Sequence, residues 1–451
     1  MEDGDGNMLL LIYFYLFIII AILLIVLAVV VTVKSYLSRG GKLFGKRVLA
    51  VRAKSKAHGV ILGRTSRRSV CYLPEGAEGH VVVFGPTGKG KTSALLIPTL
   101  RSWQGTALVI DISGDISSNV QNDNKIVFDP AKPDTAVYNV FAAIDAAETE
   151  DEKNERLEQL AFLLMPDKPN DSEAGAFFNR EGRKILTAAL TCYYYEGWGF
   201  IEICEFILSN DWRSLMNDIA KHDNKIANMN LSGFLGSNDQ NNAGCKQSCD
   251  SVIKLFGTNS NIKRALRKTK SYEKTISPAS LETNSIYICV DEPKLELYAP
   301  MVRIITAQSM EYFFQRPKKN KQAILFCLDE FASLGKMDIL AGLRRLRKRR
   351  VFLMVLTQEL ADIDLVYGKD ERKAMMGNFA VTVLLGCKNP ETQEYFQKLI
   401  GNKKSLFAIE TDDQKKVPIV EAADLAKLDD DLIVISDDGY RRLRKNYYFK
   451  K

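Results

Sequence analysis

Eight consecutive residues have the composition of a phosphate-binding loop. They are Gly85, Pro86, Thr87, Gly88, Lys89, Gly90, Lys91 and Thr92. The glycines allow backbone N–H groups to turn toward phosphate oxygens, and the start of a following helix adds a favourable dipole. In this pattern Lys91 is expected to contact the β- and γ-phosphates, and the Thr92 hydroxyl to hold Mg²⁺. The loop therefore predicts binding of ATP with Mg²⁺.

Two adjacent acids, Asp329 and Glu330, stand at the end of the most apolar of the expected strands, 323–329. A carboxylate at the carboxyl end of a parallel strand lies at the edge where α/β sheets bind ligands. We assign Asp329 to the Mg²⁺ side of the site and Glu330 to the base that polarises the attacking water. Such a pair can also simply face solvent, but the upstream phosphate-binding loop favours the catalytic interpretation.

Gln358 follows the apolar stretch 351–356, and a basic cluster precedes that stretch. Gln358 could sense the γ-phosphate or orient the water, or could serve only as a polar strand cap. The basic residues crowd one predicted helix; they are Arg344, Arg345, Arg347, Lys348, Arg349 and Arg350. This cluster could meet DNA phosphates without reading sequence, supply an arginine to a neighbouring subunit's γ-phosphate, or remain a solvated surface.

Seven short apolar stretches are expected to form the strands that position these residues. They are 80–84, 106–111, 125–129, 285–290, 323–329, 351–356 and 381–386. Apolar strands separated by helical patterns are typical of a parallel sheet that is covered on both faces. The first stretch directly precedes Gly85, so the loop has the strand–loop–helix setting that phosphate binding requires.

The remaining chain suggests an α/β domain with an all-α insertion. Between 145 and 274 there are helical patterns and no convincing strand. We divide the chain into an N-terminal transmembrane anchor (1–33), a basic juxtamembrane segment with the entry to the motor (34–79), a RecA-like nucleotide-binding domain (80–144 and 275–451) and an all-helical insertion (145–274). The basic, aromatic tail 440–451 is expected to be a final strand with a ragged end, and not a binding motif.

Residues 8–33 contain no charged side chain. As a helix they would extend roughly 39 Å, enough to cross a hydrocarbon core of about 30 Å. The acidic start and the length of the stretch argue against a cleaved signal peptide. Eight Lys and Arg residues lie within 34–56 and none precede the stretch. This asymmetry predicts a single-pass anchor with the C-terminal part of the chain in the cytoplasm.

The overall composition is that of a globular protein, with 46% hydrophobic and 26% charged residues, which argues against wholesale disorder. The net charge of +7 is compatible with a nucleic-acid or anionic-lipid partner. Cys245 and Cys249 are the only close pair among eight cysteines, and the three histidines are dispersed. No metal site is therefore expected beyond the Mg²⁺ that accompanies the nucleotide.

The stretch 328–336, which reads LDEFASLGK, resembles the hallmark motif of TraG/TraD-type coupling proteins of type IV secretion systems. The loop Gly85–Thr92 with the following 97–100 is similar to the phosphate loop and helix of that family. Gln358 with 367–368 is similar to its third motif. Ser113 departs from the family pattern, which usually has a lysine there.

The resemblance implies a RecA-like P-loop NTPase with an inserted all-α domain, an N-terminal membrane part and assembly as a homohexamer at the bacterial inner membrane. The one transmembrane helix expected here departs from the family, because many members have two. It implies an ATP hydrolase that binds DNA without sequence preference, together with a relaxase or another secreted protein. The motor would pass this substrate to the secretion channel during conjugation. By the same resemblance, Arg347 is the candidate for the arginine that acts on a neighbouring subunit.

Two alternatives stay open. An FtsK-type DNA pump shares the motor and the anchor, but the motif at 328–336 and the helical insertion argue against it. A membrane docking receptor for the relaxosome could bind ATP without hydrolysing it. The presence of Glu330 beside Lys91, Thr92 and Asp329 favours an active enzyme, because a receptor has no chemical need for a base.

Overall fold

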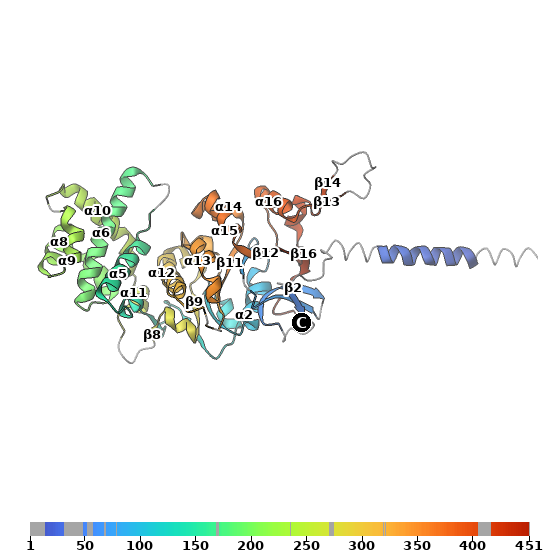
Figure 1. Ribbon diagram of the computed structural model, residues 1–451, viewed down its shortest axis with the longest axis horizontal. Helices are drawn as coiled ribbons and strands as arrows, with labels where there is room; N and C mark the ends of the chain where they lie inside the picture. The colour runs from blue at the N-terminus through green and yellow to red at the C-terminus, as the bar shows by residue number, and fades with distance from the viewer. Residues whose placement is uncertain are drawn as a thin grey trace, which may run out of the picture.

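The computed structural model describes residues 14–30, 48–51, 57–66, 69–77, 79–167, 171–234, 236–269, 275–318, 320, 322–404 and 416–450. Its central feature is one mixed sheet of twelve strands (Figure 1). From edge to edge the strands are β1 (Leu49–Val51), β3 (Ser69–Pro74), β2 (Gly59–Ser66), β16 (Gly439–Arg444), β15 (Asp431–Ser436), β12 (Phe379–Leu384), β4 (His80–Phe84), β11 (Val351–Thr357), β10 (Ile324–Leu328), β5 (Thr106–Asp111), β9 (Ser285–Cys289) and β6 (Lys125–Phe128).

The half of the sheet from β12 to β6 is parallel and buried on both faces. On β10, Ile324, Phe326 and Leu328 face one hydrophobic core. Leu325 and Cys327, between them in sequence, face a second core on the opposite side. Because successive side chains of a strand point to opposite faces, two buried faces require an unbroken apolar run. The α/β fold and the seven predicted strands are confirmed, with bounds that differ by at most two residues.

The other half of the sheet is antiparallel, and sequence analysis missed most of it. Strands β1, β2 and β3 lie within the segment 34–79, for which we had predicted a basic juxtamembrane stretch and the entry to the motor but no strands. The register of β2 against β3 shifts between Ile61 and Gly63. A Cβ on Gly63 would lie 2.9 Å from the carbonyl oxygen of Arg444 on β16. The glycine that this close approach requires interrupts the alternating pattern by which such a strand is recognised.

Helices cover the sheet on both sides and so complete the α/β domain. They are α2 (Ile97–Ser102), α3 (Asp115–Asn119), α4 (Ala142–Asp145), α12 (Leu295–Phe314), α13 (Ile339–Arg345), α14 (Leu360–Tyr367), α15 (Lys369–Met376) and α16 (Pro390–Ile400). A small antiparallel pair, β13 (Asn402–Lys404) and β14 (Lys416–Pro418), follows α16.

Seven helices form a bundle at one end of the molecule, shown in green in Figure 1. They are α5 (Glu150–Leu164), α6 (Glu173–Tyr195), α7 (Phe200–Ser209), α8 (Trp212–Lys221), α9 (Lys225–Leu231), α10 (Asp239–Thr258) and α11 (Ser260–Leu266). The bundle lies in sequence between the short strands β7 (Val137–Tyr138) and β8 (Thr275–Ile276), which pair with each other in parallel. No described residue between these two strands belongs to a strand. One continuous core joins the bundle to the sheet, and α12 contacts α5 within it.

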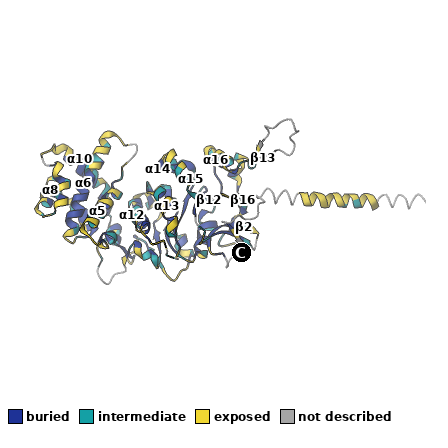
Figure 2. Ribbon diagram, viewed as in Figure 1, coloured by how far each residue is buried: buried dark blue, intermediate teal, exposed yellow. Residues whose placement is uncertain are grey.

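Residues 14–30 form a helix whose apolar side chains are nearly all exposed (Figure 2). Within the described ranges, no helix combines the length and the apolar character that a membrane crossing needs. The predicted span 8–33 is longer than this helix, and its parts 8–13 and 31–33 lie outside the described residues. The membrane anchor therefore stays a prediction.

We had predicted that the basic cluster lies on one helix, but the structure divides it between a helix, a turn and the residue before a strand. Helix α13 ends at Arg345, a short 3₁₀ turn spans Arg347–Arg349, and Arg350 has a left-handed backbone with φ of 59°. The side chain of Leu346 is fully buried in the middle of the run. Burial of this leucine and the entry into β11 at Val351 require the chain to turn, which disperses the charges.

Candidate active site

The phosphate-binding loop leaves the carboxyl end of β4, in the parallel half of the sheet. The N–H of Gly85 donates to the carbonyl of Thr357 at the end of β11 (3.1 Å). Gly90 has φ of 90°, a left-handed conformation that favours glycine. The helix that follows begins with a π-helical stretch, Lys91–Leu96, before α2. The structure thus confirms the predicted strand–loop–helix arrangement.

Lys91 lies inside the loop and is only 7% exposed. Its ammonium donates to the carbonyl of Gly85 (2.8 Å) and forms an ion pair with Oε1 of Glu330 (2.7 Å). The residue expected to bind phosphate therefore contacts the residue expected to act as the base. Because a phosphate group would also pair with Lys91, its arrival would compete with the Glu330 carboxylate for the same cation.

Asp329 lies at the end of β10, and its Oδ2 accepts a hydrogen bond from the Thr92 hydroxyl (3.4 Å). Burial and the neighbouring Glu330 carboxylate raise the pKa of Asp329 to about 6, although Lys91 opposes the shift. The second carboxylate oxygen is buried and has no hydrogen-bond partner among the described residues. An orphaned carboxylate oxygen beside a hydroxyl fits Mg²⁺, which prefers oxygen ligands.

No group of three or more His, Cys, Asp or Glu side chains that could hold a metal is found in the described part of the chain. Mg²⁺ at this position would therefore take its other ligands from phosphate oxygens and water, as is usual for this ion. Thr92 and Asp329 are the protein groups available for it.

Glu330 has a left-handed backbone with φ of 46°, one of two non-glycine residues with positive φ in the described ranges. This conformation costs about 1–2 kcal/mol for a residue that carries a Cβ. Its Oε2 accepts a hydrogen bond from the side-chain amide of Gln358 (3.5 Å), while Oε1 contacts Lys91. Strain of this kind concentrates at functional sites. Here the strained residue is Glu330, whose carboxylate contacts both Lys91 and Gln358.

The order of the strands explains why these residues meet. Strands β4, β11 and β10 are adjacent and parallel. Leu328 of β10 lies opposite Val355 of β11, and Thr357 of β11 lies opposite Phe84 of β4. Their carboxyl ends therefore lie at one edge of the sheet. Lys91, Thr92, Asp329, Glu330 and Gln358 all follow these ends.

Arg347 lies elsewhere. It precedes the amino end of β11, whereas Gln358 follows the carboxyl end. The seven residues of β11 span roughly 23 Å at about 3.3 Å per residue. Within one chain Arg347 is therefore remote from the acids and the phosphate-binding loop.

The C-terminal tail contacts the phosphate-binding loop, which the sequence did not lead us to expect. The N–H of Tyr448 donates to the carbonyl of Ser93 (3.0 Å). A Cβ on Gly90 would lie 3.1 Å from Cε1 of Tyr447. The ammonium of Lys89 pairs with Asp429, just before β15 (3.3 Å). The aromatic and basic composition of the tail was the only available signal, because its contact partners are more than 300 residues away in sequence.

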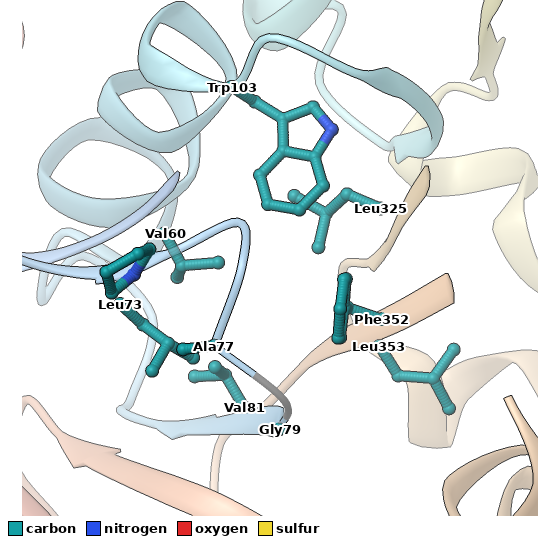
Figure 3. Close-up of a pocket in the computed structure, with 10 residues that line it drawn as sticks. Val60, Leu73, Ala77, Gly79, Val81, Trp103, Leu325, Phe352 and Leu353 are labelled. Atoms are coloured by element: carbon teal, nitrogen blue, oxygen red, sulfur yellow. The ribbon is translucent and has the colours of Figure 1, made fainter. Parts of the chain in front are cut away.

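A small cavity lies beside the amino end of β4, and Figure 3 shows the residues that surround it. Its volume is about 10 Å³. No charged side chain lines it; the lining residues are Val60, Leu73, Pro74, Ala77, Gly79, Val81, Trp103, Leu325, Phe352 and Leu353. A space of this size and character is a packing gap in the core and offers no chemistry to a substrate.

The sequence was compared with families and curated proteins. A family model described as type IV secretory system conjugative DNA transfer matches residues 32–415. The protein VirD4 of Rhizobium rhizogenes is 23% identical over 422 residues, which cover 84% of this chain and 60% of VirD4. The probable conjugal transfer protein TraG of Sinorhizobium fredii is 23% identical over 353 residues, 74% of this chain and 54% of TraG. The chain thus spans little more than half the length of these relatives.

The fold was compared with solved structures. The plasmid coupling protein TrwB in complex with the ATP analogue ADPNP superposes with a TM-score of 0.69 at 18% identity, covering 92% of this chain and 97% of that one. TrwB in complex with ADP and Mg²⁺ also gives 0.69, at 19% identity and with 91% and 98% coverage. The chain therefore has a TrwB-like α/β fold.

Proposed function

Because this chain belongs to the type IV secretory system conjugative DNA transfer family, we propose that it is a coupling ATPase. It would use ATP to drive DNA with a bound relaxase, or another secreted protein, into a type IV secretion channel during conjugation. The observation that carries the proposal is the meeting of Lys91, Thr92, Asp329, Glu330 and Gln358 at one edge of the sheet. Each of these side chains has a type that ATP hydrolysis uses.

ATP and Mg²⁺ are the cofactors that this site would hold. The loop Gly85–Thr92 would surround the phosphates, with Thr92 and Asp329 toward the metal. Support comes from two structural neighbours, which are TrwB in complex with ADPNP and TrwB in complex with ADP and Mg²⁺. When bound, Mg²⁺ neutralises charge on the β- and γ-phosphate oxygens.

The protein's own groups would act in sequence. The Lys91 ammonium would leave the Glu330 carboxylate and pair with a phosphate oxygen. Glu330 would then be free to accept a proton from water. Gln358, which already donates to Glu330, would hold that water and the carboxylate in a fixed relation. The strained backbone of Glu330 would keep its side chain at the edge of the sheet and out of the core.

The assembly and the location belong to the same proposal. In a homohexameric ring the amino end of β11 on one subunit could face the site of its neighbour, so that Arg347 acts in trans. The uncharged stretch 8–33 would anchor the chain in the bacterial inner membrane with the motor in the cytoplasm. The exposed apolar side chains of residues 14–30 support this part of the proposal.

The test is ATP hydrolysis by the full chain in detergent, with and without single- and double-stranded DNA. We expect DNA to stimulate turnover and Glu330→Gln to lower it about 10²–10⁴-fold, the usual contribution of a general base. Glu391→Gln, at an exposed glutamate on α16, is the matched control and should keep full activity. Bound nucleotide without hydrolysis under every condition would instead favour the docking receptor.

A further inference from the structure

The segment after β16 packs directly on the phosphate-binding loop. The backbone N–H of Tyr448 bonds to Ser93 in the first turn of the helix, and the ring of Tyr447 lies against Gly90. Two contacts of the buried Lys445 hold this segment in place. Its backbone N–H donates to the carbonyl of Asp430 (2.8 Å), and its ammonium donates to the carbonyl of Asp429 (2.5 Å).

The order of strands places this segment on one defined side of the loop. Glu330 and Gln358 follow β10 and β11, on one side of β4. The tail follows β16, which lies beyond β12 and β15 on the other side of β4. A nucleotide that directs its γ-phosphate toward Glu330 must extend its nucleoside away from β11. The nucleoside would therefore lie on the side where the tail packs.

The tail offers aromatic surface at that position. The rings of Tyr447 and Phe449 have centroids 5.3 Å apart and an interplanar angle of 35°. Phe449 is 60% exposed, and the ammonium of Lys450 lies 4.5 Å from the centre of the Tyr447 ring. Exposed aromatic faces stack on nucleobases whatever the base. A neighbouring cation suits a ligand that carries phosphates.

We propose that Tyr447 and Phe449 form the nucleoside wall of the site and stack on the base of the nucleotide whose phosphates bind Gly85–Thr92. This inference rests on the proposed nucleotide binding and extends it to a segment far away in sequence. It also revises our sequence-based expectation for the tail: the final strand is present as β16, and the residues that follow it bind the ligand.

The experiment separates base recognition from phosphate recognition. Binding of ATP and of inorganic tripolyphosphate, each with Mg²⁺, is measured by calorimetry on the full chain. Tyr447→Ala should weaken ATP binding about tenfold, the loss expected when one stacking ring is removed. Its affinity for tripolyphosphate should stay within about twofold of wild type, because tripolyphosphate has no base to stack. Tyr447→Phe keeps the ring and should bind ATP as wild type does.

A matched control is Tyr195→Ala, which removes a 40% exposed tyrosine from α6 in the helical bundle and should change neither affinity. Unchanged ATP affinity in both Tyr447→Ala and Phe449→Ala would overturn the inference. Equal losses for ATP and tripolyphosphate would also overturn it, because the tail would then only support the loop. Lys91→Ala should lose both ligands. If wild type bound neither ligand, the proposed function would fail and the inference with it.

Discussion

At the scale of single residues, the Lys91–Glu330 ion pair links binding to chemistry. The two side chains are 2.7 Å apart, and Lys91 is almost fully buried. While the pair persists, Oε1 of Glu330 is held by the Lys91 ammonium and is not available to a water molecule. Phosphate that draws Lys91 away would therefore activate Glu330 at the moment when the substrate is in place.

The pair predicts opposite effects of one substitution on binding and on turnover. Glu330→Gln removes the competitor for Lys91, so we expect ATP to bind about three- to tenfold more tightly, a gain of about 1 kcal/mol. Hydrolysis should be lost in the same variant. Calorimetry on the wild type and the variant, with Glu391→Gln as the control, measures the first effect. Weaker ATP binding by Glu330→Gln would show that the carboxylate assists the ligand and does not compete with it.

The buried Lys445 predicts a dependence of stability on pH. Burial, together with the positive charge of Lys89, lowers the pKa of Lys445 to about 8 from its usual value of 10.5. Between these two values the unfolded chain binds more protons than the folded chain, so the free energy of unfolding rises with pH. We expect this group to add about 1–3 kcal/mol between pH 8 and pH 10.5. Urea unfolding of wild type and Lys445→Met measures the difference, and a parallel rise in both proteins would contradict the assignment.

At the scale of elements, β10 leads directly into the two acids and contributes side chains to both hydrophobic cores. Leu325 on this strand is fully buried and lines the small cavity in Figure 3. Leu325→Ala would enlarge an existing gap, so we expect a loss of about 2–5 kcal/mol in the free energy of unfolding. Leu365→Ala, at a leucine that is 86% exposed on α14, should change it by less than about 0.5 kcal/mol. Urea unfolding of the wild type and both variants measures these losses. Equal losses for Leu325→Ala and Leu365→Ala would show that Leu325 does not stabilise the core as described.

The same strands show how far the sequence could predict the molecule. Strands that are buried on both faces, such as β10 and β11, are apolar throughout and were located within two residues. Asp329 and Glu330, which directly follow such a strand, could therefore be expected at the edge of the sheet. Strand β2 was missed because Gly63 and a register shift break its pattern. The contact of Tyr447 with the loop was missed because it depends on the order of β12, β15 and β16, which no local pattern encodes.

At the scale of the whole molecule, the position of Arg347 has a consequence for assembly. Arg347 precedes β11, at the opposite edge of the sheet from Gln358, so any action on nucleotide must be on a neighbouring subunit. Arg347→Ala should then bind ATP normally and hydrolyse it about 10³-fold more slowly, the usual effect of losing such an arginine. Lys348→Ala is the matched control and should keep its activity.

Mixing two inactive variants tests the action in trans. In assemblies that contain both Lys91→Ala and Arg347→Ala subunits, some interfaces combine an intact loop with an intact arginine. Partial recovery of hydrolysis on mixing is therefore the expected outcome. An Arg347→Ala protein with full activity by itself would remove this residue from the mechanism.

The two chain connections between the helical bundle and the α/β domain lie side by side. The chain leaves the α/β domain through β7 and re-enters through β8, and these strands pair directly, with Val137 opposite Thr275. Both ends of the bundle therefore start from neighbouring points, which is the geometry that lets a domain be inserted without disturbing its host. Because these two connections are neighbours, the seven helices from Glu150 to Leu266 could change in length or sequence while the strands of the sheet kept their pairing.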